Sequence, residues 1–196
     1  MKICIFCNSL YPLYLIDKLL VESNEVIVVI PDFKHQEILE LKHHFKIKSI
    51  SFLQISKAQL KNCDPCLLEH LNESDIVLTY TFPWLIPESI FELIPKSVNI
   101  HFSLLPKYAG SDPVFWQIKN GESYCGITFQ YLNSDFDSGD IICQYKLPIV
   151  PGENYGLLSL RLSLFVIKNW ENFIKNLDYN NDNNKIKSKE DKFYRP

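Results

Sequence analysis

The stretch KICIFCNSLYPLYLIDKLLVESNEVIVVI, residues 2–30, decides the fold. It opens with a short apolar run over 2–6, followed by a turn at 7–9 and by apolar residues at helical spacing over 12–22. The run over 25–30 is continuously apolar, which is typical of a strand covered on both faces. A strand, a helix and a strand in this order predict a parallel βαβ unit.

The same alternation continues along the chain. Strands are predicted over 47–52 (the weakest), 75–80, 97–101, 125–131 and 141–149, and helices over 36–45, 60–71, 87–93, 113–120 and 157–177. A turn before a helix is also predicted at Asp64-Pro65. The pattern predicts an α/β protein: a Rossmann-like, mainly parallel open sheet with helices on both faces.

Length and charge narrow the classes of protein. A chain of 196 residues, 46% of them apolar, favours one domain, placed over 1–178, and a polar Asn/Lys-rich tail over 179–196. Net charge is -3 without a basic run before the tail, so no nucleic-acid partner is expected. No apolar run is long enough to cross a bilayer, and the N-terminus resembles a first strand rather than a signal peptide. We therefore expect a cytoplasmic protein without a membrane partner.

Four of the six cysteines form two C-x-x-C pairs, Cys4 with Cys7 and Cys63 with Cys66. A zinc site or a redox pair is one interpretation of such spacing. Residues three apart on a strand face opposite sides, however, so the first pair converges only if its strand ends between them. Buried cysteine is also common as a small apolar side chain. We expect packing roles and no bound metal.

Ligands of open α/β sheets bind outside the carboxyl ends of the strands. Three predicted strands end at 7–9, 80–82 and 99–103, and we predict substrate contacts at Asn8, Ser9 and Ser103. Within the third segment Asn99 and His101 share one face of the strand, because they are two residues apart. An asparagine and a histidine spaced in this way can also simply cap a sheet through backbone hydrogen bonds.

An acidic loop further along the chain adds a carboxylate. Asp135, Asp137 and Asp140 share one turn with Gly139. A calcium loop is excluded because the twelfth position, which needs a glutamate, is Lys146. A solvated acidic turn remains the simple alternative. If the loop folds over the strand ends, an amide, an imidazole and a carboxylate surround one pocket. The first two can stabilise an oxygen that becomes negative, and the carboxylate can take a proton from an attacking amine.

The run NIHFSLLPKYAG over 99–110, together with DSGDI over 137–141, closely resembles the folate-dependent formyltransferase family. The resemblance covers residues 1 to about 149 and is weaker beyond that point. It implies the formyltransferase fold, a formyltransferase catalytic domain over 1–178, and 10-formyltetrahydrofolate as formyl donor. It also implies that Asn99, His101 and Asp137 are the catalytic residues.

In that family a pterin pocket is formed by the segment before the Asn strand and by the loop before the catalytic Asp. The resemblance therefore implies cofactor contacts at Phe82, Leu85, Ile86, Ile90, Leu132, Asp135 and Phe136, although the apolar ones can equally be plain core. Two departures stand out. Many relatives have histidine where this chain has Gln130, and arginine where it has Ala109.

The amine acceptor is narrowed by comparison with subgroups of the family. The first turn has no glycine, which argues against the phosphate-binding turn of the glycinamide ribonucleotide enzymes. The length and charge argue against a tRNA-binding barrel. An amino sugar nucleotide, an amino acid or a carrier-bound aminoacyl group remains. A formyltetrahydrofolate hydrolase and a non-catalytic folate-binding module are the alternative functions, and the oligomeric state stays open.

Overall fold

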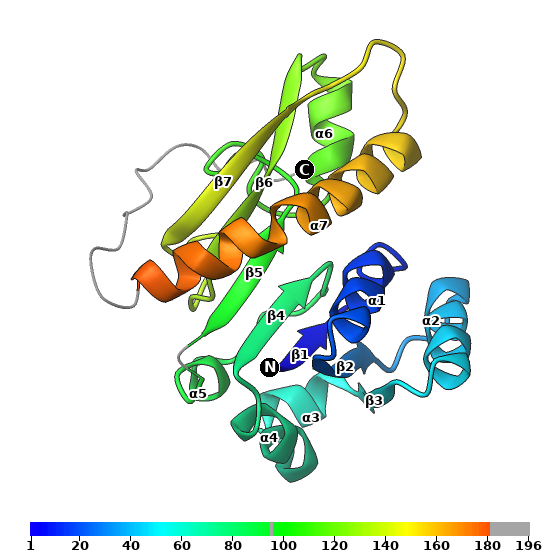
Figure 1. Cartoon of the computed structure of the whole chain (residues 1–196), viewed down its shortest axis with the longest axis vertical. Coiled ribbons are helices and arrows are strands. Elements are labelled where there is room, and N and C mark those ends of the chain that lie inside the picture. Colours follow the sequence, from blue (N-terminus) through cyan, green and yellow to red (C-terminus); the bar gives the residue numbers. More distant parts are fainter. Residues whose placement is uncertain (95, 181–196) are drawn as a thin grey trace. The chain divides into compact units, whose positions relative to one another are not determined.

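The computed structural model describes residues 1–94 and 96–180 (Figure 1). The chain divides into two compact units, Met1–Val98 and Asn99–Pro196, and the boundary falls inside strand β5 (Ser97–His101). The hydrogen-bonding order of the strands is β3 (Ser51–Ile55), β2 (Glu25–Pro31), β1 (Lys2–Phe6), β4 (Ile76–Tyr80), β5, β6 (Tyr124–Tyr131) and β7 (Ile141–Pro148). The predicted fold class, a mainly parallel open sheet of Rossmann type, is confirmed.

Unit 1 contains four parallel strands. They are β1 (Lys2–Phe6), β2 (Glu25–Pro31), β3 (Ser51–Ile55) and β4 (Ile76–Tyr80). The central strand β1 pairs with β2 on one side and β4 on the other, so that Ile3 lies opposite both Val26 and Ile76. All five residues of β4 are buried, as the continuous apolar run predicts.

The helices of unit 1 cover both faces of these strands. Helices α1 (Leu13–Val21) and α2 (Gln36–Ile47) follow β1 and β2, while α3 (Lys57–Lys61) and α4 (Pro65–Asn72) lead back from β3 to β4. Because parallel crossovers are right-handed, reversing the direction of travel moves the helices to the opposite face. Figure 1 shows α1 and α2 on one side of the strands and α3 and α4 on the other. The short helix α5 (Glu88–Phe91) precedes β5.

Two predicted elements of unit 1 are wrong in their bounds. The single helix predicted over 60–71 is two helices, α3 and α4, because Cys63 has φ +53° and Pro65 starts the second helix. Asp64 caps this second start by accepting from the Cys66 and Leu67 amides. The weak strand predicted over 47–52 begins at Ser51, because α2 continues to Ile47.

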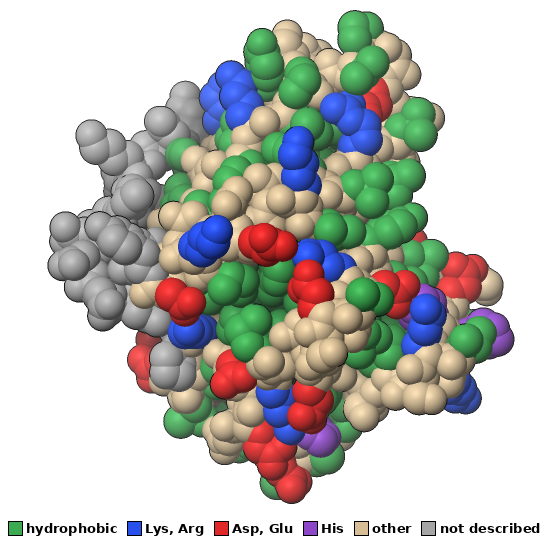
Figure 2. Space-filling model, in the orientation of Figure 1, with side chains coloured by type: hydrophobic (Ala, Val, Ile, Leu, Met, Phe, Trp, Pro, Cys, Tyr) green, Lys and Arg blue, Asp and Glu red, His purple; other side chains and the backbone are tan. Residues whose placement is uncertain are grey.

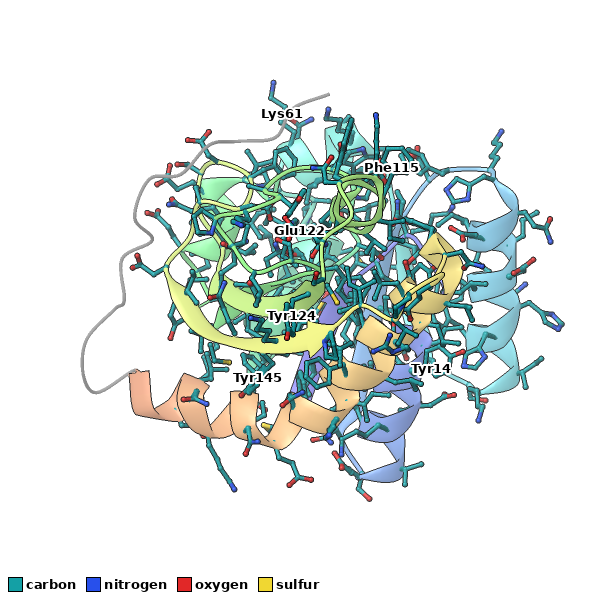
Figure 3. The ribbon with its side chains drawn as sticks, turned by 90° about the horizontal axis from the view of Figure 1, so that it is seen from above. Tyr14, Lys61, Phe115, Glu122, Tyr124 and Tyr145 are labelled. Atoms are coloured by element: carbon teal, nitrogen blue, oxygen red, sulfur yellow. The ribbon has the colours of Figure 1, made fainter. Side chains whose placement is uncertain are left out.

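Unit 2 is built around an antiparallel hairpin. Strands β6 (Tyr124–Tyr131) and β7 (Ile141–Pro148) pair directly, helix α6 (Pro113–Lys119) precedes them and helix α7 (Tyr155–Asn180) follows. Phe129 of β6 stacks on Phe173 of α7 with ring centroids 4.2 Å apart. Tyr145 of β7 lies on the same side, where Figure 3 shows it next to α7. The α7 side of the hairpin is therefore apolar, and its other side is available for polar groups.

Charged side chains of both signs are interspersed on the molecular face drawn in Figure 2. Within residues 1–94 and 96–180, no helix combines the length and hydropathy needed to cross a membrane. The predicted polar tail over 179–196 lies almost wholly outside the described residues, and α7 continues to Asn180.

Candidate active site

Strand β5 carries the first two residues of the site. Its sequence SVNIH alternates, so Ile100 faces away from Asn99 and His101. His101 is 6% exposed and Asn99 is half-buried. A polar face on an otherwise buried strand needs polar partners, and the next two loops supply them.

The loop after β5 is held by hydrogen bonds from the polar side of the hairpin. Thr128 of β6 donates to the Ser103 carbonyl at 2.6 Å and accepts from the Leu105 amide at 3.2 Å. Gln144 of β7 donates to the Leu105 carbonyl at 2.8 Å, and Ser103 Oγ donates to the Lys107 carbonyl at 2.6 Å. These contacts fix the path of the loop between the end of β5 and Tyr108, where the chain returns to the His101 ring.

Tyr108 lies in the same loop and orients the histidine ring. Its φ is +59°, in the left-handed region, and its carbonyl oxygen is 2.8 Å from His101 Nε2. A carbonyl can only accept, so Nε2 carries a proton. The Tyr108 hydroxyl donates to Glu122 Oε1 at 2.7 Å, which anchors the residue from the other end. Sequence reasoning missed this backbone contact, because no side-chain pattern encodes it.

The acidic loop between β6 and β7 is a pre-formed turn. The Tyr131 amide donates to the Asp140 carbonyl at 2.9 Å, and a Cβ added at Gly139 would lie 1.7 Å from the Tyr131 carbonyl oxygen. Asn133 donates to the Ser138 carbonyl across the turn at 3.3 Å. The glycine is therefore required by close approach of two backbone segments. The result places Asp137 at φ +52°, a conformation that aspartate tolerates better than most residues.

The carboxylate of Asp137 is the centre of the site. Its Oδ1 accepts from Asn99 Nδ2 at 3.0 Å and from Gln130 Nε2 at 3.1 Å, and lies 3.3 Å from His101 Nδ1. Its Oδ2 accepts from the Gly110 amide at 2.8 Å. The His101 and Asp137 side chains are each 7% exposed. The predicted trio is thus brought together, and Gln130 and Gly110 complete its surroundings.

This arrangement can hold and move a proton. Nε2 of His101 donates to the Tyr108 carbonyl. The contact between Nδ1 and Asp137 Oδ1 is attractive when a proton lies between these two atoms. Hydrogen bonds to a carboxylate are among the stronger ones in proteins, and here they act on a nearly buried group. The cluster is therefore suited to acid–base chemistry on a bound group, and the interpretation of the acidic loop as a solvated surface turn is not favoured.

The other predicted ligand residues of unit 2 differ in accessibility. Phe136 is 50% exposed, Asp135 is exposed and Leu132 is half-buried, so each presents surface to a ligand. Ser103 does not: it is 0% exposed, and its hydroxyl is used within the loop. The structure therefore gives Ser103 a role in shaping the loop in place of the predicted substrate contact.

Unit 1 carries the predicted residues Asn8 and Ser9 at the end of β1. Ser9 Oγ is 2.7 Å from Thr81 Oγ1, which itself donates to the Tyr80 carbonyl at 2.6 Å. Ser9 is therefore the donor in the first contact. Thr81 has φ +63°, a rare conformation for a β-branched residue and one found at functional sites. The end of β4 is thus held in a specific geometry by the end of β1.

The segment after β4 divides into surface and core. Leu85 is 38% exposed and Phe82 is half-buried, whereas Ile86 and Ile90 are 3% and 0% exposed. The last two side chains fill the core, the alternative that the sequence left open.

An aromatic cluster also joins the strand ends of unit 1. Phe82 packs on Phe6 at 5.1 Å and on Trp84 at 5.5 Å between ring centroids, and Phe33 packs on Trp84 at 5.4 Å. The sequence did not predict that Phe33 belongs to this cluster, because a single aromatic residue after a strand forms no periodic pattern.

The cysteines of the first C-x-x-C pair are packed in the core of unit 1. Burial raises the pKa of the Cys4 thiol to about 12 and also raises the pKa of the Cys7 thiol. Cys63 and Cys66 lie at the start of α4, and Cys63 Sγ is 3.2 Å from Ser89 Oγ. Among the described residues, no group of three or more His, Cys, Asp or Glu side chains is placed to hold a metal ion.

Comparison with known proteins gives a family. The model of the family described as formyl transferase matches residues 1–165. Methionyl-tRNA formyltransferase of Syntrophus aciditrophicus (strain SB) is 38% identical over 103 residues, which are 51% of this chain and 33% of that protein. The same enzyme of Staphylococcus epidermidis (strain ATCC 12228 / FDA PCI 1200) is 41% identical over 93 residues, 46% of this chain and 30% of that protein. The matches thus span about a third of these relatives' length.

Solved structures resemble the fold. Glycinamide ribonucleotide transformylase 1 from Symbiobacterium toebii has a TM-score of 0.74 at 22% identity, covering 89% of this chain and 85% of that one. WlaRD, a sugar 3N-formyl transferase solved in the presence of dTDP and 5-N-formyl-THF, has a TM-score of 0.69 at 21% identity, covering 96% and 66%. At such identities the likeness shows the fold alone.

Proposed function

The chain belongs to the formyl transferase family, and we propose that it moves the formyl group of 10-formyltetrahydrofolate onto a primary amine of a small acceptor. The observation that carries the proposal is the convergence of Asn99, Gln130, His101 and the Gly110 amide on the Asp137 carboxylate. Transfer forms a bond between the amine nitrogen and the formyl carbon and breaks the bond from that carbon to the folate nitrogen. One proton leaves the amine, and one reaches the departing nitrogen.

Asp137 is assigned the proton transfer. It is a buried carboxylate whose Oδ2 accepts from the Gly110 amide at 2.8 Å, whereas Oδ1 faces Asn99, Gln130 and His101. A carboxylate oxygen has two lone pairs, so Oδ2 can accept from the attacking amine as well as from the Gly110 amide. The proton taken there can pass to the leaving nitrogen, so that no side chain is covalently modified.

Asn99 and His101 are assigned two different tasks. Asn99 donates to Asp137, and its side-chain amide is proposed as the neutral donor that stabilises the oxygen that becomes negative as the amine attacks. Both ring nitrogens of His101 already face protein acceptors, the Tyr108 carbonyl and Asp137. This geometry supports a role for His101 through Asp137, by sharing its proton, over the direct stabilisation of the oxyanion expected from the sequence.

Folate is proposed as formyl donor on the family's known chemistry and on the surfaces available in each unit. Leu132 and Phe136 in unit 2, and Phe82 and Leu85 in unit 1, are accessible apolar side chains at the predicted positions. A pterin ring is flat and partly apolar, and suits such partners. Within unit 2 we assign folate contacts to Leu132 and Phe136, with Asp135 as a polar partner. Within unit 1, taken by itself, Phe82 and Leu85 are the candidate folate contacts, and Ile86 and Ile90 have a supporting role in the core.

The acceptor is proposed as an amino sugar nucleotide, or as an amino acid or carrier-bound aminoacyl group. The turn after β1 presents the half-buried side chain of Asn8, a hydrogen-bonding group, in place of a glycine-rich phosphate turn. Ser9 is 8% exposed and its hydroxyl donates to Thr81, so its proposed part is to support this turn. The alternatives, a formyltetrahydrofolate hydrolase and a folate-binding module without catalysis, rest on no separate observation of the structure.

The test is an absorbance assay of tetrahydrofolate release from 10-formyltetrahydrofolate, run with a panel of amino sugar nucleotides and amino acids and without any amine. Release that depends on one class of amine supports the proposal and gives the acceptor. Release without amine identifies a hydrolase. Tight folate binding without release under any condition contradicts transfer to these small acceptors.

A further inference from the structure

Gln130 at the end of β6 contacts the carboxylate of the site but belongs to neither the predicted trio nor the predicted ligand contacts. Its Nε2 donates to Asp137 Oδ1 at 3.1 Å, and the residue is 1% exposed. A carboxylate accepts, so this contact fixes which end of the amide is nitrogen. The side chain is therefore a buried, neutral donor aimed at the proposed base.

Strand geometry explains how Gln130 reaches this position. Thr128 and Gln130 share the polar side of β6, opposite Phe129, which stacks under α7. The pairing of β6 with β7 shifts register between Phe129 and Gln130, where Ile142 of β7 is skipped, so the extra residue of this bulge lies in β7. Gln130 itself keeps the alternation of β6 and lies one residue before the strand ends, next to the acidic loop.

The other end of the amide points to what this position is used for. Gln130 Oε1 is buried and has no hydrogen-bond partner within residues 1–94 and 96–180. Buried polar atoms are nearly always paired, and an apolar side chain of the same size would avoid the unpaired oxygen. Packing alone does not account for a glutamine here. The feature that an apolar replacement would lack is the N–H directed at Asp137.

Resting on the proposed function, we propose that Gln130 is a positioning residue of the formyl-transfer site: its amide N–H holds the Asp137 carboxylate in the orientation that accepts a proton from the amine. Because an amide does not titrate, the donor is present at every pH. The titratable group facing Asp137 from β5 is His101, and Asp135 and Asp140 belong to the same loop as Asp137. Across the described ranges, the other hydrogen bonds to this carboxylate come from Asn99 and the Gly110 amide.

The first test replaces the amide by a side chain of similar size that cannot donate. Gln130→Met removes both the N–H and the unpaired oxygen. We expect kcat to fall about tenfold or more at every pH, the lower end for a lost polar contact to a catalytic group, while the melting temperature changes little. A residue that only packs would lose melting temperature and kcat together. Full kcat in Gln130→Met overturns the proposal.

The second test, Gln130→Glu, replaces the amide by a titratable group of the same shape. It places a second carboxylate against Asp137, and two adjacent carboxylates share a proton. When protonated, the introduced carboxyl donates an O–H in place of the N–H, so kcat should recover as the pH falls from about 8 to about 6. Acid recovery that exceeds any recovery of wild type supports the proposal.

Gln117→Glu is the matched control for this variant. Gln117 is also a buried amide, 2% exposed, and it donates to the Phe102 and Pro113 carbonyls instead of to a carboxylate. Both introduced carboxyls regain a donor at low pH, so kcat is expressed per folded protein, and recovery of this kcat should be confined to position 130, which faces the proposed base. Recovery shared by both variants overturns the proposal.

A stability measurement separates this proposal from the proposed function. In Gln130→Glu, Asp137 raises the pKa of the introduced carboxyl above its unfolded value. Stability is then complete below the unfolded pKa and is lost as pH rises through the folded pKa. The gap in melting temperature between wild type and the variant should therefore widen from about pH 6 to about pH 8. If wild type releases no tetrahydrofolate with any amine, the proposed function fails, and this gap still tests the contact. A gap that does not change with pH overturns the contact itself.

Discussion

Units 1 and 2 are similar in length but differ in how regular their backbone is and in which residues they contribute to the candidate site. Unit 1 is regular: its parallel strands are buried, and its helices follow from apolar spacing. Unit 2 carries the Asn99–His101–Asp137 cluster, and two residues that form or contact it, Tyr108 and Asp137, have left-handed backbone. Unit 1 also has left-handed residues, and they lie in the connections between its regular elements: Ser23, Ser49, Cys63 and Thr81. The difference teaches that periodic sequence builds the frame, while irregular backbone, stabilised by specific hydrogen bonds, positions the chemistry.

The largest expected effect tests whether the irregular unit depends on one apolar contact. Phe173→Ala removes the ring stacked on Phe129 and should lower the free energy of unfolding by about 3–5 kcal/mol. Chemical denaturation followed by circular dichroism measures it. Leu164→Ala on the same helix is the control, because Leu164 is 47% exposed and its truncation should cost far less. Equal losses in both variants would contradict the assignment of Phe129 and Phe173 as the centre of this core.

The next effect separates chemistry from folding inside unit 2. Asn99→Ala, His101→Ala and Asp137→Ala should each lower turnover by about a hundredfold or more, the scale of a lost oxyanion donor or general base. Circular dichroism should remain that of wild type. Asp32→Ala, an exposed carboxylate in unit 1, is the control. Wild-type turnover in both His101→Ala and Asp137→Ala would refute the assigned roles.

A smaller effect tests the pre-formed acidic loop. In Gly139→Ala the new Cβ meets the Tyr131 carbonyl oxygen at 1.7 Å, so the turn must move and Asp137 with it. We expect a loss of about 2 kcal/mol in stability, with a fall in turnover that exceeds the loss of folded protein. Gly156→Ala is matched, because its Cβ would lie 3.6 Å from Asn154 Oδ1 and it sits in α7. Indifference of turnover to Gly139→Ala would show that the loop adapts freely.

The effect that is smallest near neutral pH concerns the core of unit 1. Burial raises the pKa of Cys4 from 9.0 to about 12, so between these values the unfolded chain releases a proton that the folded chain keeps. Stability is then complete below the unfolded pKa and falls with rising pH by up to about 1.4 kcal/mol per pH unit for one thiol. Cys4→Ala should flatten the slope of unfolding free energy against pH in this range, and exposed Cys66→Ala should not. Identical slopes in all three proteins would contradict the burial of this thiol.

The sequence predicted different parts of the molecule for different reasons. Strands such as 76–80 were predictable because one physical rule, burial on both faces, produces one pattern. The division of α3 from α4 depended on how Pro65 competes with the helical spacing around it, which spacing alone does not decide. Asn99, His101 and Asp137 were identified by resemblance. The amide of Gly110 and the carbonyl of Tyr108 were not, because backbone groups leave no side-chain signature.

The Tyr108 carbonyl that accepts from His101 Nε2 has a consequence for mutational scanning. The group that orients the ring belongs to the main chain, so every amino acid at position 108 supplies it, provided that the backbone keeps its φ of +59°. Glycine and asparagine reach this conformation most easily. Tolerance at this position should therefore rank substitutions by conformational preference and by the lost bond to Glu122, not by side-chain chemistry. In a library of variants sorted for activity, position 108 would therefore look variable, although its main-chain carbonyl makes the hydrogen bond that orients His101.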